Sequence, residues 1–94
     1  MCVRLMKLEK VFTLKNELGL HARVAAMLVN VGSRYSSAIS FEKDGMVADG
    51  SSILDILTLA CPKGCSFIIK AEGDDAGAAM EEFDRLIESK FGED

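Results

Sequence analysis

The sequence predicts an α+β fold, a two-layer open-faced sandwich in which three helices cover one face of a four-stranded, mainly antiparallel sheet. The first observation is the order of the expected elements: strand, helix, strand, strand, helix, strand, helix. The second is size and composition, since 94 residues that are 49% hydrophobic and 28% charged suit one globular domain over residues 1–94. We therefore expect a single core beneath one sheet.

The first half of the chain contains a strand and a helix separated by a loop. Residues 8–14 are rich in β-forming side chains and end at the breakers Asn16 and Gly19. Residues 22–31 are helix formers with few polar members, and Gly32 stops them. We expect a strand followed, after the loop, by a helix.

A hairpin and a short helix are expected next. Residues 38–43 alternate apolar and polar side chains, which is the period of a strand, and residues 46–48 can pair back. Asp44-Gly45 between them is typical of a tight hairpin turn. Residues 52–60 are expected to be helical and to end before Pro62–Gly64.

The chain closes with a strand over residues 66–71 and a helix over residues 75–91. This last helix is amphipathic, and its expected buried face is Ala79, Met80, Phe83, Leu86 and Ile87.

Charge and hydropathy exclude several classes of partner. The net charge of −4 makes nucleic acid and anionic membranes poor partners. No apolar stretch approaches the ~18 residues that span a bilayer, and none near the start resembles a signal peptide, so we expect a cytoplasmic protein without membrane insertion. Nine acidic and two basic residues fall within residues 72–94, which predicts a solvated helix face.

Three cysteines, Cys2, Cys61 and Cys65, do not indicate a disulfide scaffold, because the number is odd and the chain can build its own core. Cys61-Pro-Lys-Gly-Cys65 has one residue more between its cysteines than a redox or metal-chaperone loop, and only Cys2 and His21 remain as soft ligands. We expect free cysteines flanking a turn, and no metal or organic cofactor.

The helices expected over residues 22–31 and 52–60 have more apolar side chains than one buried stripe needs. Adjacent exposed apolar side chains would indicate a surface for a partner. The alternative is that the helix limits are wrong and the surplus belongs to the core.

His21 is the only histidine and comes just before the first helix, with Arg23 two positions later. A side chain there lies beside unpaired backbone N–H groups and the positive end of the helix dipole, where phosphate binds readily. A neutral imidazole is a nucleophile, and an arginine can hold phosphoryl oxygens. The alternative is a histidine that only caps the helix or packs in the loop.

The stretch Asn16-Glu-Leu-Gly-Leu-His21-Ala-Arg23 resembles the active-site loop of the HPr family, the histidine-containing phosphocarriers of the bacterial phosphotransferase system. Residues 51–57, Ser-Ser-Ile-Leu-Asp-Ile-Leu, and the later Lys63-Gly64 resemble the second helix of the family and the turn after it. The ending Ser-Lys-Phe-Gly-Glu-Asp is similar to the nitrogen-related branch, NPr, as well. The resemblance does not separate the two branches.

The resemblance implies a phosphocarrier, not an enzyme that turns over a small substrate. His21 would take a phosphoryl group on Nδ1 from enzyme I and pass it to a sugar-specific or regulatory IIA protein. Arg23 would stabilise the added charge, and the N–H groups of Ala22 and Arg23 would bind phosphate oxygens. The expected docking surface is Met27, Ile53, Leu54 and Leu57. A carrier docks several partners in turn and leaves each quickly, which suits a modest apolar surface rather than a large obligate interface. A monomer is expected.

Ser52 matches a serine that a dedicated kinase phosphorylates in some members of the family. The competing interpretation is a helix N-cap, and Ser52-Ile-Leu-Asp55 resembles a capping box.

Two features depart from the family pattern. Val24 stands where proline usually follows the arginine, which leaves the geometry of the loop open. Residues 1–6 are expected to be a flexible N-terminal extension or to reflect a mis-assigned start, because Met6-Lys7-Leu8 resembles the usual beginning. The rival function is a regulatory protein-binding module on the same fold that does not transfer phosphate. A metal chaperone is disfavoured because the first loop has no cysteine.

Overall fold

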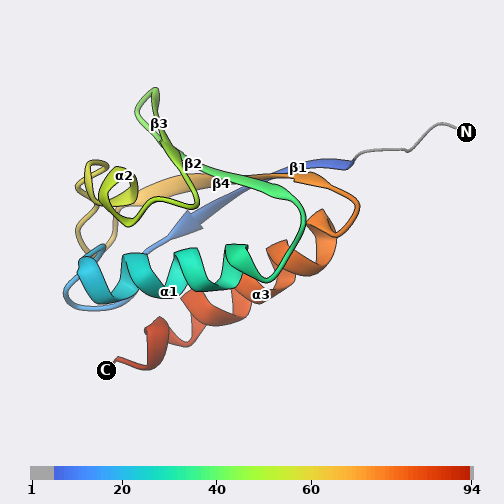
Figure 1. Cartoon of the computed structure of the whole chain (residues 1–94). Helices are drawn as coiled ribbons and strands as arrows, with labels where there is room; N and C mark the ends of the chain where they lie inside the picture. Colours follow the sequence, from blue (N-terminus) through green and yellow to red (C-terminus); the bar gives the residue numbers. More distant parts are fainter. Residues whose placement is uncertain (1–5, 94) are drawn as a thin grey trace, which may run out of the picture.

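The computed structural model describes residues 6–93, and Figure 1 shows their arrangement. The elements in chain order are β1 (Met6–Thr13), α1 (Ala22–Ser33), β2 (Ala38–Lys43), β3 (Met46–Asp49), α2 (Ile53–Leu57), β4 (Ser66–Gly73), α3 (Ala76–Glu88) and a final 3₁₀ turn, Lys90–Gly92. No helix in this part of the chain is long and apolar enough to cross a membrane.

The four strands form one antiparallel sheet in the order β1-β4-β2-β3. The long helices α1 and α3 contact each other and lie side by side along one face of the sheet (Figure 1). The short helix α2 packs against α1 and β3. The predicted fold class, an antiparallel four-stranded sheet with three helices, is confirmed.

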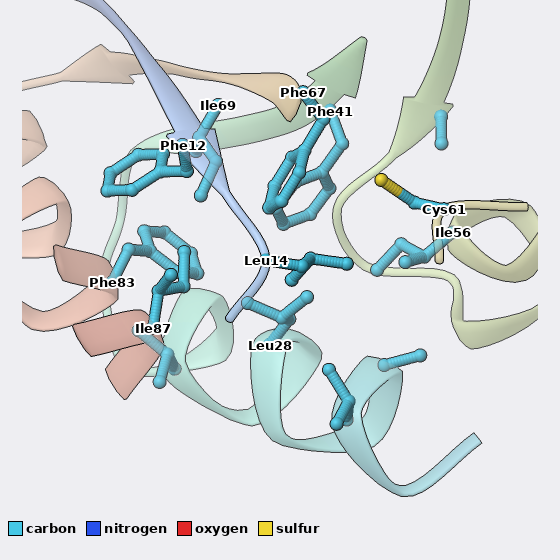
Figure 2. Close-up of a cluster of buried hydrophobic side chains, with 14 of the residues drawn as sticks. Phe12, Leu14, Leu28, Phe41, Ile56, Cys61, Phe67, Ile69, Phe83 and Ile87 are labelled. Carbon is cyan, nitrogen blue, oxygen red and sulfur yellow. The ribbon is translucent and has the colours of Figure 1, made fainter. Parts of the chain in front are cut away.

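Alternation along the strands builds the core. Phe12 of β1 is paired with Phe67 of β4, and both side chains are buried. Phe41 of β2 meets the ring of Phe83 from α3 edge-on, with centroids 5.9 Å apart. These rings belong to one cluster, which also includes Leu14 from the β1–α1 loop (Figure 2). The core therefore extends from the sheet to the segment that precedes His21.

The hairpin forms as predicted, because Asp44 and Gly45 adopt φ angles of 51° and 82°, the left-handed values that a tight turn of this type needs. The helix expected over residues 52–60 is wrong in extent. It covers only Ile53–Leu57, and the chain leaves the helix at Ala60, whose φ is 50°.

The last helix is also shorter than predicted, because α3 ends at Glu88. Lys90 and Phe91 both have a φ of 57°, so the chain turns away from the helix axis at this point. The side chain of Phe91 is buried in the core and anchors the turn. Of the side chains expected on the buried face of α3, only Leu86 is partly exposed.

Met6 was expected in a flexible extension, and that expectation is wrong: Met6 opens β1 and pairs with Gly73 of β4. Residues 1–5, including Cys2, lie outside the described residues.

Glu81 and Glu88 of α3 are exposed, as expected for a solvated helix face, whereas Glu82 and Asp84 are partly buried. Asp84 and Glu88 contact basic residues in or beside β1. Lys10 Nζ lies 3.0 Å from Asp84 Oδ1, and Lys15 Nζ lies 2.7 Å from Glu88 Oε2. Exposed ion pairs of this kind add little stability. They do place opposite charges where the first strand meets the last helix.

Cys61 and Cys65 form a disulfide, with their Cα atoms 5.5 Å apart, so the expectation of free thiols is wrong for this pair. The intervening residues fold into a turn in which the Cys65 N–H donates to the Pro62 carbonyl. This turn brings the two side chains together, and a count of cysteines does not reveal it.

The disulfide-closed turn, residues 61–65, braces the loop that leads to His21. The N–H of Leu20 donates to the Cys61 carbonyl at 2.7 Å, and the N–H of Leu14 donates to the Cys65 carbonyl at 3.0 Å. Gly19 adopts a φ of 64°, and a Cβ atom there would lie 2.6 Å from the Cys61 carbonyl oxygen. Glycine is therefore required both by the backbone conformation and by the close approach of the two segments.

We predict that Gly19→Ala lowers the free energy of unfolding by about 2 kcal/mol or more. Alanine is strained in the left-handed backbone conformation of this position, and its Cβ atom would also clash with backbone atoms of Cys61 and Pro62. Urea denaturation measures the change. The matched control is Gly77→Ala in α3, where a Cβ atom meets nothing within 4 Å and alanine favours the helix. Equal stability of the two variants would contradict the close contact at Gly19.

We predict that a thiol reductant lowers the free energy of unfolding by about 2 kcal/mol, the loop-closure term for a bridge over so short a segment. Urea denaturation with and without dithiothreitol measures it. A Cys61→Ser/Cys65→Ser variant should start at the lower stability and show no response to reductant. An identical transition midpoint for the wild-type chain in both conditions would contradict the prediction.

Candidate functional site

His21 is the N-cap residue of α1, with an extended backbone (φ −118°, ψ 178°). The first bond within the helix runs from the Ala25 N–H to the His21 carbonyl at 2.9 Å. The N–H groups of Ala22, Arg23 and Val24 therefore lack a partner within the helix, and they give this end a partial positive charge. The His21 side chain makes no capping hydrogen bond, so it does not serve as the cap of the helix.

The imidazole of His21 is 29% exposed and faces the carboxylate of Glu93, with 2.8 Å between Nε2 and Oε2. The other carboxylate oxygen accepts a 2.9 Å hydrogen bond from Nδ2 of Asn16. Asn16 is fully buried, and its second amide hydrogen goes to the Gly19 carbonyl at 2.8 Å. The bond from Asn16 lowers the pKa of the Glu93 carboxyl group, and His21 and the Arg23 charge lower it as well, against the opposing effect of burial.

Arg23 follows on the first turn of α1, with its side chain 59% exposed. Nη2 donates to the Phe91 carbonyl at 3.1 Å and lies 3.6 Å from Oε2 of Glu93. The C-terminal turn thus contacts both side chains of the His-Ala-Arg stretch. A long and exposed arginine side chain can leave such a contact at low cost when a phosphate binds.

Glu93, Asn16 and the Phe91 carbonyl are the site residues that sequence reasoning missed. Asn16 lies in the stretch that resembles the HPr active-site loop, but its only expected role is to end the first strand. Glu93 lies in the ending that resembles NPr, but it is expected only to be solvated. No local signal indicates the contact, because 72 positions separate His21 from Glu93. Only the left-handed turn at Lys90 and Phe91 brings the carboxylate back to the start of α1.

Ser52 is the N-cap residue of α2, where Oγ accepts a 3.2 Å hydrogen bond from the Asp55 N–H. The predicted capping box is only half formed. The Asp55 carboxylate does not return the bond to Ser52 but accepts one from the Asp49 N–H. Aspartate is shorter than the glutamate of a standard box, which accounts for the difference.

The surplus of apolar side chains divides between the core and the surface. Ile53 and Leu54 of α2 are 38% and 76% exposed, whereas Met27 of α1 and Leu57 of α2 are half-buried against the core. Together with the contact between α1 and α2, these four side chains define what we call the apolar patch. Leu18, in the His21 loop, is 72% exposed and was not predicted.

Val24, the residue in place of the family proline, is fully buried in the core. Its side chain contributes to the packing of α1, and its N–H is one of the three groups without a partner in the first turn of that helix. Among residues 6–93, no group of three or more His, Cys, Asp or Glu residues could hold a metal ion.

Comparison with known proteins gives this arrangement a family. The family model PTS-HPr, described as "PTS HPr component phosphorylation site", matches residues 8–89. The chain belongs to the HPr family. It is therefore a phosphocarrier-type protein of the phosphotransferase system, as the resemblance in sequence predicted.

Relatives from both branches of the family resemble the chain to the same degree. The phosphocarrier protein HPr of Xylella fastidiosa is 34% identical over 87 residues, which are 93% of this chain and 98% of that protein. The phosphocarrier protein NPr of Shewanella violacea is also 34% identical over 87 residues, 93% of this chain and 96% of that protein. Sequence identity does not divide the HPr and NPr branches here.

Solved structures agree with the fold. The crystal structure of HPr-C-His from Thermoanaerobacter tengcongensis superposes with a TM-score of 0.87 at 43% identity, covering 92% of this chain and 97% of that one.

Proposed function

We propose that this HPr-family chain accepts a phosphoryl group on Nδ1 of His21 from enzyme I and passes it to a IIA protein. The observation that carries the proposal is the position of His21 at the N-terminus of α1, beside the free N–H groups of Ala22 and Arg23. Backbone donors and the helix dipole stabilise a phosphate there without a metal ion. Arg23 lies two residues after His21, and its side chain is largely exposed, so its guanidinium group can reach the phosphoryl group on His21.

We propose that Val24, in the first turn of α1, also serves the phosphate site. A proline at this position would lack an N–H, whereas valine retains one at the end of the helix where phosphate binds. Its buried side chain also packs α1 against the core. We infer that the departure from the family pattern adds a donor and leaves the acceptor in place.

The apolar patch of Met27, Ile53, Leu54 and Leu57 is the proposed docking surface for enzyme I and IIA proteins. It combines two exposed side chains with two half-buried ones, on helices that pack together. A modest apolar surface suits partners that bind in turn and dissociate quickly. We propose that the carrier works as a cytoplasmic monomer, which such transient contacts favour.

Ser52 is assigned to the N-cap of α2. Its Oγ accepts the hydrogen bond from Asp55 that begins the helix, a contact worth about 1 kcal/mol. A serine kinase would have to compete with this bond before it could modify the hydroxyl. The cap is therefore the role that the geometry favours.

We predict that incubation with phosphoenolpyruvate and enzyme I of the same organism adds the mass of one phosphoryl group, in an acid-labile form. His21→Ala should abolish the adduct, because the nucleophile is lost, while circular dichroism should show an unchanged fold. Mass spectrometry at neutral and acid pH makes the measurement. If the wild-type chain forms no adduct while the enzyme I preparation is demonstrably active, the result would favour the rival function, a regulatory module that binds partners without transferring phosphate.

We predict that Leu54→Glu raises about tenfold the KM of enzyme I for this chain as its substrate. The reason is that the charge introduced into the apolar patch must be desolvated when enzyme I docks. The kcat and the stability should change little, because Leu54 is exposed. Steady-state phosphorylation kinetics give both constants. The matched control is Val11→Glu, on the sheet face opposite the buried Phe12, which should behave as wild type. Equal KM values for the two variants would refute docking through the patch.

A further inference from the structure

The contact between Glu93 and His21 has a chemical consequence that the proposed function does not contain. A hydrogen bond to a neutral imidazole determines which ring nitrogen carries the proton. The ring has one hydrogen bond to residues 6–93, the one between Nε2 and the Glu93 carboxylate. The identity of the partner therefore decides the tautomer.

An ionised carboxylate accepts hydrogen bonds and cannot donate one. Glu93 is ionised at neutral pH, because its neighbours hold its pKa below the usual value. Nε2 must then be the donor, and the proton lies on Nε2. The remaining lone pair is on Nδ1, the nitrogen that becomes the nucleophile in the proposed transfer.

The carboxylate is itself held in place. Its Oε1 atom accepts from Asn16, which is fully buried and also bonded to the Gly19 carbonyl. The buried Phe91 ring anchors the backbone two residues earlier. Glu93 is only 17% exposed, so its contact with the ring is better shielded from water than a surface ion pair.

We propose that Glu93 is the positioning residue of the phosphocarrier site: it fixes the Nε2–H tautomer of His21 and thereby keeps Nδ1 free for the phosphoryl group. Asn16 orients the carboxylate for this role. The inference rests on the proposed function for its use in transfer, but the tautomer is a property of the isolated protein.

The same contact supports the transfer step. The Nδ1 lone pair forms a bond to phosphorus while the P–N bond of the donor phosphohistidine breaks, and that electron pair returns to the donor nitrogen. The proton on Nε2 stays in place, and the ring of His21 gains positive charge. Glu93, 2.8 Å from Nε2, faces this charge and stabilises it. Transfer to an acceptor histidine reverses these changes.

Glu93→Gln is the variant that tests the tautomer most directly. The glutamine amide has one accepting oxygen, whereas both Asn16 Nδ2 and His21 Nε2 donate to the Glu93 carboxylate. If the Asn16 amide rotated by half a turn, it would lose its hydrogen bond to the Gly19 carbonyl. Its own oxygen would then face that carbonyl oxygen, so Asn16 keeps its NH₂ group toward residue 93. The imidazole, in contrast, needs only to move a proton. The glutamine oxygen therefore takes the bond from Asn16, its NH₂ group faces Nε2, and the proton of the ring shifts to Nδ1.

The test combines a spectrum with a rate. Nitrogen-15 NMR of the His21 ring, at a pH where the imidazole is neutral, should show the Nε2–H tautomer in the wild-type chain and a raised Nδ1–H population in Glu93→Gln. The kcat/KM for phosphorylation by enzyme I and phosphoenolpyruvate should fall about tenfold, the usual effect of losing a partner that orients a reactive histidine. Glu93→Ala should also slow transfer, without the forced shift to Nδ1–H.

The matched control is Glu88→Gln, which removes one carboxylate from the same end of the chain and breaks only the surface contact with Lys15. It should keep the wild-type spectrum and rate. Identical tautomer populations in the wild-type chain and Glu93→Gln would overturn the proposal. So would a slower transfer without a change of tautomer, or a shifted tautomer without a slower transfer.

Failure of the proposed function is separable from failure of this inference. In the first case the wild-type chain takes up no phosphoryl group. In the second the wild-type chain takes up the group normally, and Glu93→Gln keeps either the wild-type tautomer or the wild-type rate.

Discussion

The position of His21 depends on one close backbone contact, between residues 14–20 and the disulfide-closed turn of residues 61–65. Hydrogen bonds join the two segments at both ends. Position 19 lies against the backbone of the turn, and glycine is the only residue type that fits there. The turn leads directly into β4, which pairs with both β1 and β2. The same contact therefore aligns the central strand, the loop and the first turn of α1.

A second long-range contact completes the site from the other end of the chain. The backbone leaves α3 at Glu88, turns through the left-handed residues Lys90 and Phe91, and places Glu93 against the ring of His21. The buried Phe91 side chain makes this turn part of the core. A partly buried histidine at a helix end thus acquires a fixed partner from the far end of the chain.

The sequence predicted the sheet and the order of its elements because these leave local patterns: alternation in residues 38–43 and Asp44-Gly45 for the hairpin. It also predicted that His21 lies directly before α1, and the structure places it there as the N-cap residue. It failed where the cause is not local. The early end of α2 depends on a left-handed Ala60, and the disulfide depends on how the chain folds at Pro62. The sequence does not distinguish Glu93 from the solvated carboxylates around it. Only the turn at Lys90 and Phe91, which is held by the packing of Phe91, places it beside His21.

The two contacts together suit a carrier that must give its group away as easily as it takes it. In the proposed function, a phosphate at the start of α1 needs hydrogen-bond donors, and the N–H groups of Ala22, Arg23 and Val24, which have no partner within the helix, would supply them. In the proposed transfer, Nδ1 gives its lone pair to phosphorus when His21 accepts the group and recovers the pair when the group leaves. With the proton held on Nε2 by Glu93, neither direction exchanges a proton with water. Each docking event then requires only that phosphorus pass between two nitrogens, so a brief contact through a modest surface is sufficient.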